Sequence, residues 1–134
     1  MAIEDLMADI FNQIIEGNTL NESVGEWNIS NLNSPLLVEM YRPDAIYGFE
    51  SGAQDDFVYF NNYHREARKG TGTKSLKQLE AAFDVLAKKR KQKVVVLFDT
   101  FKQEDTGAWL TKKGYILDDL NGRKIYQKIF DPNS

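Results

Sequence analysis

Two glycines and several basic residues lie close together in the segment Arg65–Ser75, which reads Arg-Glu-Ala-Arg-Lys-Gly-Thr-Gly-Thr-Lys-Ser. Gly70 and Gly72 allow the backbone to turn tightly and to approach a ligand closely. The following apolar pattern predicts a helix, whose first amide groups and positive dipole end favour an anion, most naturally a phosphate group. Three nearby cations add positive charge: Arg68, Lys69 and Lys74. The alternative is that the glycines make only a tight strand-to-helix turn.

Two common phosphate-binding loops do not fit this segment. A Walker loop needs Gly-x-x-x-x-Gly-Lys-Ser/Thr, but Ala67 stands at the first glycine position and Thr73 separates Gly72 from the lysine. The dinucleotide fingerprint Gly-x-Gly-x-x-Gly would place Ser75 at its third glycine, and it normally follows the first strand of a βαβ unit. Here the segment follows several strands that tight turns connect, which favours an antiparallel meander.

The elements around this segment are predicted from apolar periodicity and turn residues. Helical spacing predicts three helices: Ile3–Ile15, Thr73–Lys89 and Glu104–Lys113, the last ending at Gly114. Strands are predicted at Val24–Ile29, Leu36–Tyr41, Ala45–Glu50, Phe57–Tyr63, Val94–Phe98, Tyr115–Leu117 and Lys124–Phe130. Val94–Phe98 is uninterrupted and apolar, which is typical of a strand that is covered on both faces. Asn121-Gly122 predicts a hairpin between the last two strands.

This order of elements resembles the GNAT superfamily of acyl-CoA-dependent N-acetyltransferases. The resemblance runs from about Leu36 to Phe130 and includes the family motif Gln/Arg-x-x-Gly-x-Gly/Ala, to which this chain contributes Gly70 and Gly72 but has Ala67 at the leading position. It implies an α/β (α+β) fold with a mixed, mostly antiparallel central sheet of about six to seven strands, flanked by helices. Here a helix precedes that sheet, and we expect residues 1–134 to form a single domain.

The resemblance implies acetyl-CoA as cosubstrate. In the family, amide groups of the Gly-x-Gly loop bind the coenzyme pyrophosphate, and a strand splayed from its neighbour pairs with the pantetheine arm. An aromatic residue of the later helix walls the channel in some relatives, although it can equally be a core residue. The corresponding positions in this chain are Phe60, Asn61, Asn62, Arg68, Lys69, Gly70, Thr71, Gly72, Thr73 and Trp109.

The resemblance also indicates where proton transfer would occur. Some family members place a carboxylate base fourteen positions before the first loop glycine, which here is Asp56. The alternative is that Asp55-Asp56 belongs to an exposed turn. Glu50 is a second candidate base, and Tyr59 or His64 could relay protons. The family's usual tyrosine acid aligns with Leu110, which cannot donate a proton, so a catalytically degenerate binding module is the alternative function.

Charge is divided unequally along the chain. Residues 1–63 contain eleven acidic residues and one basic residue, for a net charge of −10, whereas residues 64–134 have a net charge of +7. If the basic half binds the coenzyme, the acidic half favours a cationic acceptor such as a protein lysine, a protein N-terminus or a polyamine. The alternative is that folding mixes both charges over solvated faces.

Composition excludes several other classes of protein. With no Cys and one His, the chain can hold neither a thiolate zinc site nor a His-rich metal site, and we expect no metal. No apolar run is long enough to span a bilayer and the start lacks a signal-peptide pattern, so we expect a cytoplasmic protein with no membrane partner. Sheet edges of two copies of the chain could also pair to form a homodimer, and the sequence leaves this alternative open. A nucleic-acid-binding domain using Arg65, Arg68, Lys69, Lys74, Lys77 and Lys88–Lys93 is a third alternative, which the acidic half disfavours.

Overall fold

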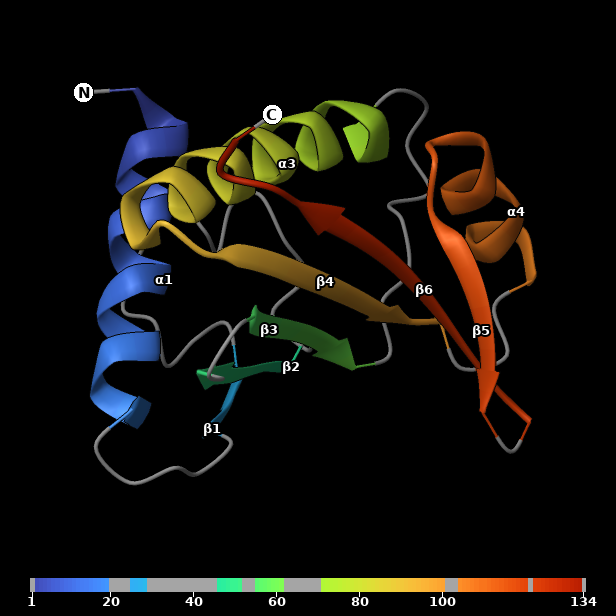
Figure 1. Cartoon of the computed structure of the whole chain (residues 1–134). Coiled ribbons are helices and arrows are strands. Elements are labelled where there is room, and N and C mark those ends of the chain that lie inside the picture. Colours follow the sequence, from blue (N-terminus) through green and yellow to red (C-terminus); the bar gives the residue numbers. More distant parts are fainter. Residues whose placement is uncertain are drawn as a thin grey trace.

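The computed structural model describes residues 2–19, 25–28, 46–51, 55–61, 71–100, 104–120 and 122–133 (Figure 1). Within these residues the chain is a mixture of helices and strands, which confirms the predicted α+β class and the helix before the sheet. The elements in order are α1 (Ile3–Thr19), β1 (Gly25–Asn28), β2 (Ile46–Ser51), β3 (Asp55–Asn61), α3 (Thr71–Arg90), β4 (Lys93–Asp99), α4 (Glu104–Lys112), β5 (Ile116–Leu120) and β6 (Arg123–Phe130).

The described strands form one mixed sheet in the order β1-β2-β3-β4-β6-β5. β3 and β4 are parallel, with Asp55 opposite Lys93 and Phe60 opposite Phe98. The other described neighbours pair antiparallel. Because two adjacent parallel strands cannot be joined by a hairpin, the chain returns between them through α3, which lies across the sheet.

Most predicted elements are present, and two of their boundaries differ in a way that bears on function. Strand β3 begins at Asp55 instead of Phe57, so Asp55-Asp56 belongs to the strand and the predicted exposed turn at these residues is wrong. Helix α3 begins at Thr71, two residues earlier than predicted. Gly114, two residues after the last residue of α4, has φ of +92°, which confirms the predicted glycine cap. The predicted strand Leu36–Tyr41 lies outside the described residues.

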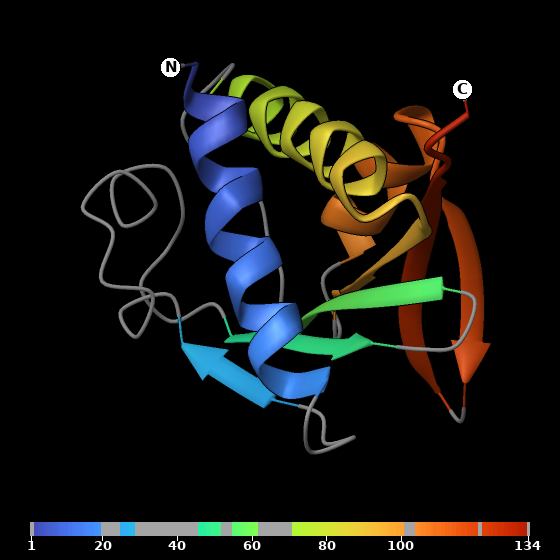
Figure 2. The same ribbon diagram turned by 60° about the vertical axis from the view of Figure 1, so that its left-hand side comes forward.

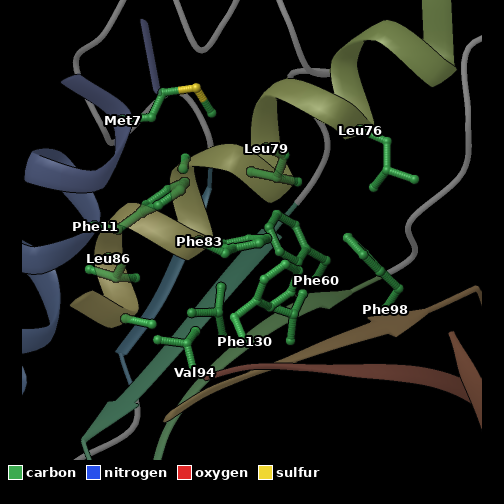
Figure 3. Packing of buried hydrophobic residues seen from close by; sticks show 14 of the residues in the cluster. Met7, Phe11, Phe60, Leu76, Leu79, Phe83, Leu86, Val94, Phe98 and Phe130 are labelled. Carbon is green, nitrogen blue, oxygen red and sulfur yellow. The ribbon is translucent and has the colours of Figure 1, made fainter. Parts of the chain in front are cut away.

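Aromatic rings from helices and strands meet in one core (Figure 3), and α1 and α3 lie over the same side of the sheet (Figure 2). The ring centroid of Phe83, on α3, lies 5.8 Å from that of Phe11 on α1, 6.0 Å from that of Phe60 on β3 and 5.4 Å from that of Phe130 on β6. Trp109 and Leu110 bring α4 into the same cluster. Ring pairs at these distances add about 0.5–1.5 kcal/mol each to the stabilisation from burial.

The two faces of the sheet differ in their cover. Side chains alternate along a strand, so Val58 and Phe60 face the core and Tyr59 faces away from it. The outward positions of β5 and β6 include exposed apolar side chains, with Ile116 at 66% and Ile129 at 54% exposure. None of the described helices combines the length and apolar character that a membrane crossing requires.

Close packing of α4 on β6 gives a test of this arrangement. A Cβ atom added to Gly107 would lie 2.2 Å from the hydroxyl oxygen of the buried Tyr126. We therefore expect Gly107→Ala to lower the free energy of unfolding by about 1–3 kcal/mol, measured by urea denaturation. Ala108→Ser, at an exposed neighbouring position, should change it by less than about 0.5 kcal/mol. An unchanged midpoint for Gly107→Ala would contradict this contact.

Candidate active site

The N-terminus of α3 lies at the carboxyl end of the parallel pair β3 and β4. The helix runs opposite to both strands, and its first turn consists of Thr71, Gly72 and Thr73 (Figure 1). The first amide groups of a helix have no acceptor within it, and together with the dipole they make this end suitable for an anion. The expected coenzyme residues Asn62, Arg68, Lys69 and Gly70 lie outside the described residues, as do Ala67 and His64.

The splay expected between two central strands is not observed along β3. Its ladder with β4 continues through Phe60 opposite Phe98, and the Phe60 side chain is fully buried, with its ring 4.8 Å from that of Phe98. Asn61, the last residue of β3, pairs with Ile46 of β2. The expectation that Phe60 offers a free strand edge to a pantetheine arm is therefore wrong, because its strand is already paired on both sides.

Asp56 is a buried partner of an arginine. The Nε atom of Arg90 donates to Oδ2 of Asp56 at 2.5 Å, and its Nη2 atom donates to Oδ1 at 3.4 Å. Arg90 also donates to Asn12 at 3.0 Å, so this guanidinium joins β3 and α3 to α1. The Asp56 side chain has no exposed surface, and about 16 Å of strand separates its residue from Asn61. The structure thus does not bring this predicted base to the N-terminus of α3.

The structure does not bring the remaining predicted site residues together in one place. Glu50 pairs with Phe57 in the register, which places it toward the amino end of β3 with Asp56. Trp109 is 8% exposed and belongs to the core, as its alternative interpretation predicts, and Leu110 beside it is completely buried. Among the predicted catalytic residues that the structure describes, only Tyr59 lies near the carboxyl end of the parallel pair.

A polar cluster that the sequence analysis does not identify surrounds Tyr59. The Tyr59 hydroxyl donates to Oδ2 of Asp99 at 2.5 Å, and Nη2 of Arg123 donates to the same oxygen at 2.6 Å. Asp99 is completely buried, Tyr59 is half-buried and the Arg123 side chain is 53% exposed. The three residues come from the adjacent strands β3, β4 and β6, on the face opposite α1 and α3. One feature of the sequence could have indicated this cluster: Asp99 is an acidic residue directly after the apolar run Val94–Phe98.

Comparison with known proteins returns no relative: no protein-family model, no curated protein and no solved structure matches the chain.

The Asp56–Arg90 pair predicts a large effect on stability. Asp56→Asn leaves the largely buried guanidinium without its counter-charge, so we expect the free energy of unfolding to fall by about 3–5 kcal/mol in chemical denaturation. The neighbouring Asp55→Asn has the same chemistry at a less buried position and should cost less than about 0.5 kcal/mol. If Asp56→Asn were as stable as the wild type, the pair would not have the structural role described here.

Proposed function

We propose that the protein is an acetyl-CoA-dependent N-acetyltransferase of the GNAT superfamily that acts on a cationic amine. The observation that carries this proposal is the position of the α3 N-terminus, with its Gly-x-Gly sequence, at the carboxyl end of the parallel strands β3 and β4. The order of the described elements, strands followed by α3, β4, α4 and a final hairpin, is the order on which the family resemblance depends.

The first turn of α3 is the proposed pyrophosphate site. Amide groups of Thr71, Gly72 and Thr73 would donate to the phosphate oxygens, as helix N-termini do for other phosphates. The proposal assigns the preceding residues Arg68, Lys69 and Gly70 to the same phosphates, from their positions in the sequence. α3 has no acidic residue in its first turn to compete with an anion, which supports this assignment.

The reaction is acyl transfer from sulfur to nitrogen. The lone pair of a neutral amine attacks the thioester carbonyl, a C–N bond forms and the C–S bond breaks. The nitrogen loses one proton, and the departing thiolate of coenzyme A gains one, so the products are an amide and a free thiol. Holding the amine and the thioester in the correct geometry can supply up to about 7–11 kcal/mol of the lowering of the barrier.

The cationic character of the acceptor follows from the charge of the chain. Two acidic residues of the first half, Asp9 and Asp56, are paired with Lys89 and Arg90 in the structure, so the charges of each pair largely cancel. The preference for a cation therefore depends on the other acidic residues of residues 1–63. The same two pairs weaken the nucleic-acid alternative, because they occupy two cations of the Lys88–Lys93 cluster.

A catalytically degenerate binding module is the second candidate function. Leu110, at the position of the family's acid, is completely buried in the core, and Asp56 is held by Arg90. Strands β3 and β4 also stay paired through Phe60, which leaves no splay within that ladder. These observations favour a protein that has the fold without turnover, and such a protein would release no thiol from acetyl-CoA with any amine.

Calorimetric titration with acetyl-CoA tests the proposed pyrophosphate site. We expect the wild type to bind, and Gly72→Glu to weaken binding at least tenfold, because the new carboxylate lies where the phosphates would be. Gln78→Glu introduces the same charge further along α3 and should change the affinity less than about threefold.

The possible results separate the candidates. Absence of acetyl-CoA binding to the wild type would eliminate the acetyltransferase. Binding without thiol release across lysine peptides, peptide N-termini and polyamines would favour the degenerate module. Equal weakening by both glutamate variants would show that the N-terminus of α3 is not the anion site.

A further inference from the structure

We propose that two copies of the chain pair antiparallel through the outer edge of β5, so that their two sheets become continuous. β5 is the last strand in the order of the described sheet, and its one partner among the described strands is β6 (Figure 1). The outer edge of such a strand carries a row of backbone N–H and C=O groups that can pair with another strand. This inference goes beyond the proposed function and does not depend on coenzyme binding.

Apolar side chains are exposed along this edge. Ile116 is 66% exposed, Leu117 is 46% exposed, and Ile129 on the neighbouring strand β6 is 54% exposed. Ile129 alternates with Phe130, which is buried in the core, so Ile129 lies on the other face of the sheet. Ile116 pairs with Gln127 and is therefore a diagonal neighbour of Ile129 on that face, whereas Leu117 points to the core side. The first half of β5 thus offers apolar surface to a partner on both faces.

The charges along this edge are self-complementary. Lys112 and Lys113 precede β5, and Asp118 and Asp119 lie in its second half. None of these four side chains forms an ion pair within the part of the chain that the structure describes. In an antiparallel pair of copies, the basic end of each edge meets the acidic end of the other. A parallel pair would instead bring like charges together, so the charges select a second copy in the antiparallel orientation.

Charges and apolar side chains agree on one register. When Ile116 lies opposite its own copy on the two-fold axis, Lys113, three residues before it, comes beside Asp119 of the partner copy, three residues after it. A register with Asp118 on the axis would place two carboxylates directly opposite each other, which is destabilising. Each copy contributes the same patch, as in most homodimers. The exposed ion pairs add little affinity and mainly determine the register.

Sedimentation velocity at protein concentrations from about 1 to 500 µM tests this interface. We expect a monomer–dimer equilibrium of the wild type with a dissociation constant of about 1–100 µM, because the paired edge is short. Ile116→Lys brings two ammonium groups together on the axis and should weaken the dimer at least about tenfold. Leu6→Lys is the matched control, since it introduces the same charge at a 43% exposed apolar position on α1 and should change the affinity less than about twofold.

Two charge reversals test the register. Lys113→Glu and Asp119→Lys each place like charges together at both ends of the interface, so each variant alone should dimerise at least about tenfold more weakly at low salt. In an equal mixture of the two variants, both ends of a mixed dimer carry opposite charges. We therefore expect the mixture to dimerise within about threefold of the wild-type affinity. Circular dichroism verifies that each variant is folded.

Three results would overturn the inference. A wild type that stays monomeric up to about 500 µM would leave an extended segment of another protein as the candidate for this edge. A dimer that Ile116→Lys does not weaken would use another surface. A mixture of the two charge reversals that stays monomeric would contradict the register with Ile116 on the axis. Because acetyl-CoA binding is measured separately, failure of the proposed function would leave this inference standing.

Discussion

The parallel pairing of β3 with β4 is the constraint on which the arrangement of the molecule depends. Parallel neighbours need a crossover, and the twenty residues of α3 span about 30 Å, more than the roughly 23 Å of a seven-residue strand. The helix therefore crosses the whole length of the pair, and its N-terminus reaches the carboxyl ends of both strands. This crossover therefore determines the position of any anion site at the start of α3. It also determines the position of the core beneath the helix.

The two ends of α3 have different environments, and ion pairs at one end balance part of the charge that is divided along the chain. At the C-terminal end, Arg90 binds Asp56 of β3, and Lys89 binds Asp9 of α1. Part of the opposite charge of the two halves is thus neutralised between elements, and the charges of the halves do not form two wholly separate surfaces. The N-terminal end has no acidic residue in its first turn. Lys89 and Arg90, which are paired in this way, are therefore less available to bind a phosphate.

Local patterns predicted the elements, whereas the polar contacts depend on strand register. The apolar run of β4, the periodicity of α3 and the glycine after α4 each act within a few residues, so their interpretation was sound. Asp55-Asp56 was misplaced because aspartate is depleted in strands, and the sequence does not show that Arg90, 34 residues later, compensates Asp56. Tyr59, Asp99 and Arg123 meet only because β3, β4 and β6 are neighbours, at separations of 40 and 24 residues.

The burial of Leu110 restricts the chemistry of the proposed site but does not exclude acyl transfer there. A side chain within the core cannot protonate a leaving group, and the hydrogen of Tyr59 is already donated to Asp99, so neither residue serves as the acid. An alkyl thiol has a pKa of about 8.5, however, and its anion leaves a tetrahedral intermediate far more readily than an alkoxide would. Without an acid from either of these residues, the proposed acyl transfer from sulfur would be slower, and an oxygen ester would be a still poorer acyl donor. Catalysis at the proposed site would therefore depend mainly on holding a phosphate-bearing thioester and an amine together.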